Sequence, residues 1–267
     1  MEGTADIMAA EFEQNFDREA RDYDSARPEY PPELYRDIFS YHAVGRGSRV
    51  LEIGLGTGKA SGPILDTGCD LVGLEPGKNL ASLARKRLAR YDNLTLRELT
   101  LQDFDCPGDT FELIYAATAF HWLPEEYGYR RVYELLRPGG TFARFAYHAG
   151  PDRIRHELTG EVYELYRRYM HGGRGEYRPL TESDGERLLA IPKRYGFTDT
   201  EFHLYEFRKD FTAEDYMGLL RTYPDHMALD PNDRQGLFGG IYDAILRHGG
   251  IMTVYYTVDL ELARRPE

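Results

Sequence analysis

Three glycines at alternate positions are the most informative chemical feature of the sequence. Gly54, Gly56 and Gly58 stand in the run VLEIGLGTGK, residues 50–59. Glycine lets the backbone turn tightly and lets a ligand approach the main chain without meeting a Cβ atom. A helix that starts directly after such a turn presents unpaired N–H groups to ligand atoms. The pattern predicts a small-ligand site where a strand passes into a helix.

A carboxylate ends the next apolar stretch, at Glu75 in the sequence LEP of residues 74–76. In folds of alternating strands and helices, an acid at this distance from a glycine turn binds ribose hydroxyls. The alternative is that Glu75 is only a solvated strand end. We expect it to bind a ribose diol.

A nicotinamide-dinucleotide site is the main rival interpretation. Its fingerprint, GxGxxG, requires glycine at position 59, which is a lysine here. The observed GxGxG spacing leaves less reason to expect a pyrophosphate at the helix start. It fits a nucleoside that carries an amino-acid tail.

The elements that must hold these residues alternate between strand and helix. The expected strands cover residues 49–53, 70–74, 94–98, 111–116 and 141–147, with helices between them. The RPGG turn at 137–140 is expected to end the helix before the fifth strand. Such alternation implies right-handed crossovers and a parallel sheet covered on both faces.

The tail follows a different pattern. Expected helices cover 151–170 and 183–195, and Pro192 should kink or interrupt the second. A long strand is expected at 198–211, followed by helices that Thr212 and Asp230 cap. A last strand is expected at 251–260. These elements predict an antiparallel addition to the sheet and a helical lid.

At these motifs the chain resembles the class I S-adenosylmethionine-dependent methyltransferases, and most of all their small-molecule "type 11" branch. The matching segments, in chain order, are ARPEYPPELY (26–35), ExGxGxG (52–58), LEP (74–76), FELI (111–114), AFHWL (119–123), LLRPGG (135–140) and LLRTYPDH (219–226). The resemblance implies a Rossmann-like α/β fold with a seven-stranded sheet, mostly parallel with its last strand antiparallel. It also implies a helical cap at 1–47, a cofactor core at 48–150 and a lid-bearing C-terminal part at 151–267.

The same resemblance implies S-adenosylmethionine as the cofactor and gives roles to matching positions. Glu52 and the three glycines would surround its methionine part, and Glu75 with Pro76 would bind the ribose. Ala117 and Thr118 would lie beside the sulfonium. One position departs from the family, because Thr100 stands where an acid often meets the adenine. Adenine recognition would then rest on backbone groups around Leu101 and Gln102.

The front segment offers Tyr23, Arg27 and Tyr30. An arginine there is suited to pair the cofactor's carboxylate through two hydrogen bonds. The alternative is a surface arginine whose neighbouring tyrosines anchor the segment to the core. We assign Tyr23 and Arg27 to the cofactor and Tyr30 to the substrate.

His121 is the candidate for substrate contact or general base, together with its neighbour Trp122. It follows the fourth strand at the carboxyl edge of the sheet, where ligands bind in open α/β folds. The alternative is that both residues pack the next helix. In the tail, Arg221, Tyr223 and His226 are further candidates for the substrate. Arg221 and His226 lie off the apolar face of their helix, so they would point into a pocket or into water.

Composition limits the possible partners. The 267 residues carry a formal net charge of −12, which argues against nonspecific nucleic-acid binding. No apolar run is long enough for a membrane helix, and no histidine or cysteine spacing suggests a metal. With two cysteines and no basic-then-apolar start, the expected compartment is the cytoplasm. The sequence therefore predicts methyl transfer from S-adenosylmethionine to a small molecule. An NAD(P)-dependent oxidoreductase and a non-catalytic cofactor-binding protein remain as alternatives, and the oligomeric state is left open.

Overall fold

The computed structural model describes residues 27–108, 110–170 and 177–267. The chain divides into two compact units. Unit 1 combines residues 1–28, 148–179 and 206–257, and unit 2 combines residues 29–147, 180–205 and 258–267. The three-part division expected along the sequence stays a prediction about roles.

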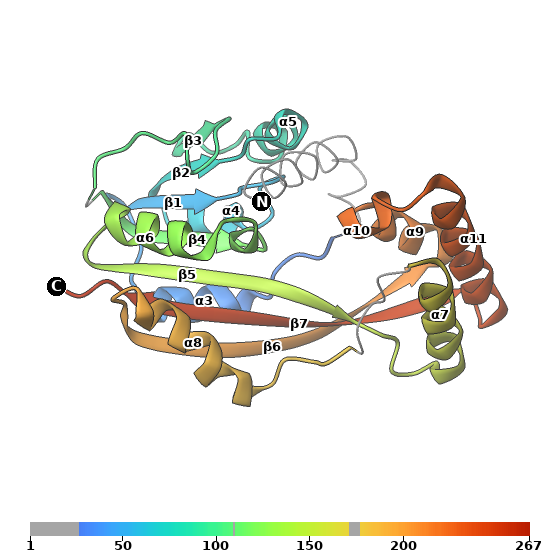
Figure 1. The fold of residues 1–267 in the computed structure, drawn as a ribbon. Coiled ribbons are helices and arrows are strands. Elements are labelled where there is room, and N and C mark those ends of the chain that lie inside the picture. Colours follow the sequence, from blue (N-terminus) through green and yellow to red (C-terminus); the bar gives the residue numbers. More distant parts are fainter. Residues whose placement is uncertain (1–26, 109, 171–176) are drawn as a thin grey trace. The chain divides into compact units, whose positions relative to one another are not determined.

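A seven-stranded sheet runs through the fold (Figure 1), in the order β3-β2-β1-β4-β5-β7-β6. Its strands are β1 (Arg49–Ile53), β2 (Asp70–Leu74), β3 (Leu94–Arg97), β4 (Phe111–Ala117), β5 (Leu136–Gly150), β6 (Thr198–Thr212) and β7 (Ile251–Arg264). The first five are paired in parallel, and β7 is antiparallel. The predicted fold class is therefore confirmed.

The register places the carboxyl ends of β1, β2 and β4 at one edge of the sheet. Val50 of β1 lies opposite Leu71 of β2 and Leu113 of β4. Because all three strands are parallel, the glycine turn after β1, Glu75 after β2 and Thr118 after β4 follow the same edge.

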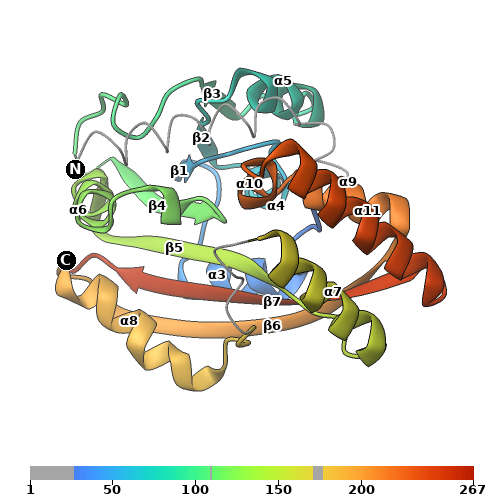
Figure 2. The ribbon, with the colours of Figure 1, turned by 45° about the vertical axis from the view of Figure 1, so that its right-hand side comes forward.

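Helices cover both faces of the sheet in unit 2, as two views show (Figure 1 and Figure 2). The helices α6 (Glu125–Leu135) and α8 (Gly185–Arg194) cover one face. On the other face lie α3 (Pro32–Tyr41) and α4 (Ser61–Leu65), while α5 (Lys78–Arg87) connects β2 to β3. A buried cluster that includes Phe120, Tyr129, Phe142 and Phe197 fills the α6 side. The core thus fixes the sheet from which the site residues project.

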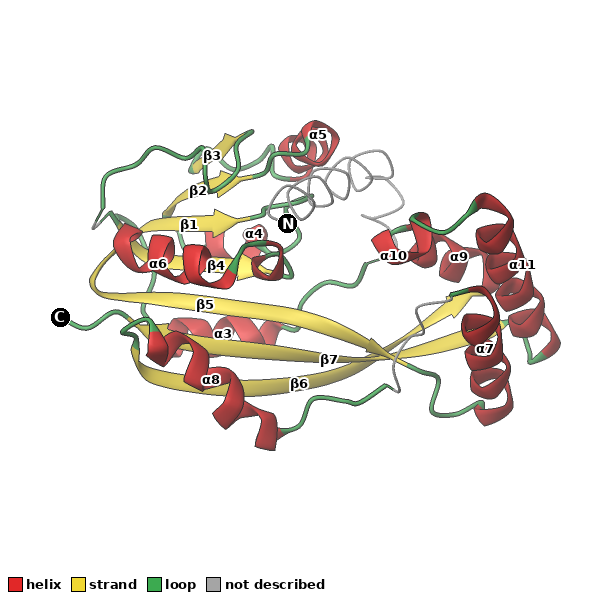
Figure 3. Ribbon diagram, in the orientation of Figure 1, coloured by secondary structure: helices red, strands yellow, loops and turns green. Residues whose placement is uncertain are grey.

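In unit 1, helices pack on one another (Figure 3). They are α7 (His156–Tyr169), α9 (Ala213–Arg221), α10 (Pro224–Met227) and α11 (Pro231–Arg247). The longest of these four described helices, α11, packs against α7 and α9. Two of its glycines make room for α7, since a Cβ on Gly236 would meet Tyr169 at 2.6 Å and one on Gly240 would meet Leu165 at 2.6 Å. The predicted caps are confirmed, since Thr212 accepts from the Asp215 amide and Asp230 accepts from the Asn232 amide.

Three local predictions were wrong in detail. The RPGG segment belongs to β5, because the amide of Gly139 and the carbonyl of Gly140 pair with the chain end around Arg265. Helix α7 starts at His156 rather than near 151, since Asp152 accepts the amides of Ile154 and Arg155 in a turn. Pro192 does not interrupt α8 but lies inside its last turn, and the helix ends soon after it, at Arg194.

None of the helices in the described parts of the chain is long and apolar enough to span a membrane.

Candidate active site

The three glycines of the turn after β1 are needed for different reasons. All three have positive φ, at 71°, 60° and 80° for Gly54, Gly56 and Gly58. A Cβ on Gly54 would meet Ala119 Cβ at 2.5 Å, and one on Gly58 would meet Leu88 at 2.7 Å. On Gly56 it would meet no described atom within 4 Å. Within the described residues, packing therefore excludes a side chain at Gly54, the Leu88 side chain crowds the position at Gly58, and the space at Gly56 is open.

Glu75 closes the turn from the neighbouring strand. Its Oε2 accepts a hydrogen bond from the Gly56 amide at 2.7 Å, and its Oε1 accepts one from the Gly77 amide at 2.8 Å. The side chain is 6% exposed. A carboxylate oxygen accepts hydrogen bonds from amide and hydroxyl donors alike, so this side chain has the chemistry that a ribose diol requires. The residue predicted to bind ribose thus lies directly against the glycine with the open space.

Glu52 lies on β1, just before the glycine turn, and is fully buried. Its Oε2 accepts hydrogen bonds from Ser61 at the start of α4 and from Tyr115 on β4, both at 2.6 Å. Its Oε1 has no hydrogen-bond partner among the residues that the structure describes. Burial raises the pKa of the Glu52 carboxyl to about 8 and raises that of the Tyr115 phenol above its usual range. Glu52 therefore joins β1 to α4 and β4, and its contact with the cofactor stays a prediction.

Thr118 follows β4 in an unusual backbone conformation. Its φ is 53°, in the left-handed region that β-branched residues rarely enter. Such a residue costs about 1–3 kcal/mol and persists only where its surroundings fix it. Its amide donates to the Phe145 carbonyl at 2.7 Å, and its hydroxyl lies 2.6 Å from the Tyr30 hydroxyl. Backbone strain of this kind gathers at functional sites.

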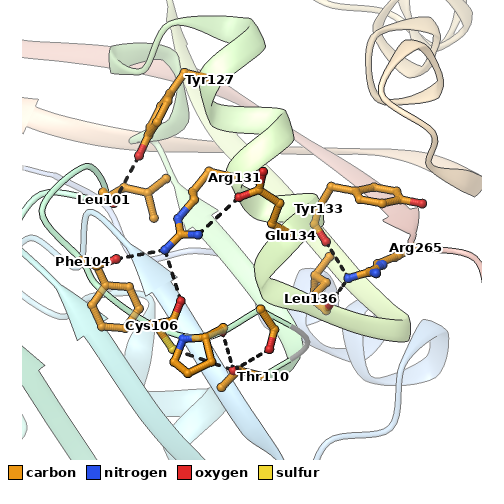
Figure 4. A network of polar contacts seen from close by, with 12 residues as sticks. Leu101, Phe104, Cys106, Thr110, Tyr127, Arg131, Tyr133, Glu134, Leu136 and Arg265 are labelled. Carbon is orange, nitrogen blue, oxygen red and sulfur yellow. Dashed lines mark hydrogen bonds and ion pairs between the residues drawn. The ribbon is translucent and has the colours of Figure 1, made fainter.

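The segment predicted to meet the adenine is fixed by α6 (Figure 4). Tyr127 donates to the Leu101 carbonyl at 3.3 Å, and Arg131 donates to the Phe104 carbonyl at 3.0 Å. Leu101 is buried, whereas Gln102 is exposed. Thr100 accepts from the Asp103 amide and thereby caps the turn that follows. The backbone here is well ordered by its neighbours, and its adenine contact stays a prediction.

His121 and Trp122 lie in a short helical turn at Phe120–Trp122, just after β4. Both side chains are exposed, Trp122 by 44%, and their rings are 4.8 Å apart. By contrast, Phe120 between them and the strand is buried in the core. The turn therefore directs one aromatic residue inward and leaves the predicted pair accessible.

Arg27 belongs to unit 1 and is 9% exposed, so it is not a surface arginine. Its Nε donates to the Thr222 hydroxyl at 3.1 Å and its Nη2 to the Thr222 carbonyl at 3.2 Å. Its guanidinium carbon lies 4.6 Å from the centre of the Tyr223 ring. These contacts hold the front segment at the end of α9.

The other tail candidates also lie in unit 1. His226 is fully buried, with Nδ1 2.8 Å from Asp225 and Nε2 2.9 Å from the Tyr166 hydroxyl. Arg221 is exposed. Tyr223, predicted for the substrate, lies 5.3 Å from His226 between ring centres. His226 therefore joins α10 to α7, and its substrate role stays a prediction.

In unit 2 the glycine turn is thus joined to Glu75 by a hydrogen bond and to Ala119, next to Thr118, by close packing, and in unit 1 Arg27 is joined to Thr222. Tyr23 lies outside the described residues. The sequence reasoning missed several partners: Ser61, Tyr115, Ala119, Thr222 and Tyr166. Three of them lie in segments already noted, since Tyr115 is in the fourth strand, Ala119 opens the AFHWL segment and Thr222 directly follows Arg221. Ser61 lies only nine residues after Glu52 but in no motif, and Tyr166 lies 60 residues from His226, a distance in the chain that a single sequence does not bridge.

The chain is similar to known methyltransferases. A family model described as "Methyltransferase domain" matches residues 50–140. An uncharacterized methyltransferase of Mycobacterium tuberculosis is 30% identical over 88% of this chain and 90% of its own length. The chain therefore belongs to the class I S-adenosylmethionine-dependent methyltransferases.

Solved structures agree with that fold. A protein of Anaeromyxobacter dehalogenans, provisionally named a type II methyltransferase, has a TM-score of 0.65 and 21% identity, covering 90% of this chain and 99% of its own. The phosphoethanolamine N-methyltransferase 2 of Haemonchus contortus was solved with S-adenosylhomocysteine and phosphomonomethylethanolamine. It has a TM-score of 0.50 and 17% identity, covering 88% of this chain and 52% of its own.

The enzyme uses S-adenosylmethionine as its cofactor. The residues around the turn fit that molecule on two observations. Among the described residues, no atom fills the space beside Gly56, and the adjoining Glu75 is a carboxylate, the group that accepts hydrogen bonds from ribose hydroxyls. The rival dinucleotide interpretation is not supported by any of these relatives.

Proposed function

We propose that the enzyme transfers a methyl group from S-adenosylmethionine to a small-molecule acceptor by direct displacement. The observation that carries this proposal is the pairing of Glu75 with the amide of Gly56, beside the open space of the turn. The net charge of −12 supports a small molecule over a nucleic acid as the acceptor. A cytoplasmic location stays a prediction from the sequence.

When bound, the cofactor supplies a methyl carbon that positive sulfur has already activated. Displacement of that methyl group by an acceptor atom would leave the carbon–sulfur electron pair on sulfur, with S-adenosylhomocysteine as the second product. The protein must bring the two reactants into line, and such positioning supplies up to ~7–11 kcal/mol in well-oriented systems.

The chain's own residues divide this work. Glu75 would hold the ribose, while Gly56 would let the cofactor lie against the backbone. Ala117 and Thr118 would line the sulfur, since both are partly exposed at the end of β4. Tyr30, His121 and Trp122 would face the acceptor. Arg221 and Tyr223 stay acceptor candidates from the sequence, whereas His226 is fully buried.

His121 is the group best suited to remove a proton from a hydroxyl or ammonium acceptor. It is exposed at the carboxyl edge of the sheet, and an ordinary imidazole titrates near neutral pH. A carboxylate acceptor would not need such a base. His121→Ala should therefore abolish turnover with a protonated acceptor and leave cofactor binding intact, and unchanged turnover would exclude His121 as the base.

The proposal is tested by incubating the enzyme with methyl-labelled S-adenosylmethionine and a panel of small carboxylic acids, amines, phenols and thiols. Label in a small-molecule product, together with S-adenosylhomocysteine, would support it. Cofactor binding with label only in protein or nucleic acid added to the same reaction would contradict the choice of acceptor. Binding without transfer to any acceptor would favour a non-catalytic protein.

A further inference from the structure

Thr118 needs an external contact to keep its backbone conformation. Its backbone φ of 53° lies in the left-handed region, which β-branched residues such as threonine avoid. The amide bond to Phe145 fixes one side of the residue, because β5 is a central strand. The side-chain hydroxyl is fixed separately, by Tyr30 at 2.6 Å.

Tyr30 is well placed to act as a rigid support. Its side chain is only 8% exposed and packs against Phe145, with ring centres 4.9 Å apart, and against Tyr147 at 5.4 Å. The preceding residue, Glu29, pairs with Lys59 at 3.1 Å. Residues 29–30 are therefore attached both to the glycine turn and to the end of β4.

The segment that Tyr30 holds also forms a wall of the glycine turn. A Cβ on Gly54 would lie 2.5 Å from Ala119 Cβ, so the two backbones approach as closely as glycine permits. A change in the conformation of Thr118 must move Ala119, because the two are covalent neighbours. Any such movement reaches the turn directly.

We propose that Tyr30 is a positioning residue for methyl transfer, and that its hydroxyl holds Thr118 so that their paired oxygens face the sulfonium. This inference rests on the proposed function, which puts Thr118 beside the cofactor's sulfur. Two hydroxyls that share one hydrogen bond retain lone pairs, and lone pairs attract a cation. S-Adenosylmethionine differs from S-adenosylhomocysteine only by the methyl group and the positive charge. The pair therefore favours the methyl-bearing form of the cofactor.

Calorimetric titration with each of these two ligands tests the inference without knowledge of the acceptor. Tyr30→Phe should raise the dissociation constant of S-adenosylmethionine about fivefold more than that of S-adenosylhomocysteine, which is the size expected from one hydrogen bond. Thr118→Val should have the same effect, and Thr118→Ser, which keeps the hydroxyl, should bind like the wild type. Because the two hydroxyls act as one unit, the double variant Tyr30→Phe/Thr118→Val should lose no more than either single variant.

Tyr195→Phe is the matched control, since the Tyr195 hydroxyl donates to Glu125 at 2.9 Å in the same unit. It should leave the preference between the two ligands unchanged. A Tyr30→Phe variant that weakens both ligands equally has only a structural role and would overturn the inference, as would losses that multiply in the double variant. If the wild type bound neither ligand, the methyltransferase assignment itself would fail.

Discussion

The carboxylate of Glu75 and the amide of Gly56 are joined by a hydrogen bond of 2.7 Å. This bond links the end of β2 to the glycine turn after β1, so two elements 19 residues apart form one edge of the site. Gly56 is also the glycine of the turn whose side-chain position is open in the described structure. The two residues together define where a ligand can meet both a carboxylate and bare backbone.

Replacing Glu75 by glutamine should weaken cofactor binding. The amide keeps the shape, but a hydrogen bond to a charged group contributes about 1.5–3 kcal/mol, so the dissociation constant should rise roughly 10- to 100-fold. Calorimetric titration with S-adenosylhomocysteine measures the change. Glu98→Gln is the control, because Glu98 is half-exposed and pairs with Arg85 near the end of β3. Equal affinities for Glu75→Gln and wild type would remove Glu75 from the binding site.

The glycines of the turn should separate stability from binding. Gly54→Ala should destabilise the fold, because alanine costs about 1–2 kcal/mol in the left-handed region and its Cβ would also meet Ala119. Gly56→Ala should cost only the backbone strain, because its Cβ would meet no described atom. It should mainly weaken cofactor binding, because the new methyl group obstructs the approach of the cofactor. Chemical unfolding and calorimetry on the two variants make the comparison. The opposite ranking, with Gly56→Ala the less stable variant, would contradict the geometry.

Glu52 should make the cofactor-free enzyme less stable as the pH rises. Its pKa is raised from 4.5 to about 8, so the folded state binds a proton more tightly than the unfolded state does. The resulting stabilisation is complete below the unfolded value and is lost as the pH rises through about 8. Urea unfolding between pH 5 and 9 should show this loss in the wild type. Glu52→Gln should flatten the profile, and a variant as pH-dependent as the wild type would exclude Glu52 as its source.

Arg27 and Thr222 allow a structural role to be told from a binding role. Thr222→Val removes the hydroxyl that accepts from Arg27 Nε, so it should lower the unfolding free energy by about 1–3 kcal/mol with little effect on cofactor affinity. Arg27→Ala should lower both the unfolding free energy and the cofactor affinity, if the guanidinium pairs the cofactor's carboxylate as predicted. Thermal unfolding and calorimetry report the two quantities. Wild-type affinity in Arg27→Ala would leave Arg27 with the structural role alone.

The spacing of apolar residues predicted most of the fold, because most of its strands and helices are specified by residues close together in the sequence. The strands β1, β2 and β4 and the caps Thr212 and Asp230 follow from apolar spacing and capping chemistry within a few residues. The RPGG segment was assigned wrongly, because its conformation depends on the chain end around Arg265. Tertiary pairing of this kind is invisible in a local pattern.

The candidate site was predicted to a similar depth. The sequence indicated the glycine turn and Glu75, because each directly follows a strand that the apolar pattern predicts. It did not show that Gly54 and Gly58 serve packing, or that Tyr30 reaches Thr118, 88 residues along the chain. His226 was expected to point into a pocket or into water, whereas burial between Asp225 and Tyr166 holds it in the interior of unit 1.

Thermal unfolding in the presence of S-adenosylmethionine, S-adenosylhomocysteine or NAD(H) shows directly which cofactor the folded enzyme binds. A ligand that binds only the folded state must raise the melting temperature. Both adenosyl ligands should raise it in the wild type and raise it much less in Glu75→Gln, and NAD(H) should leave it unchanged. A rise with NAD(H) alone would contradict the account.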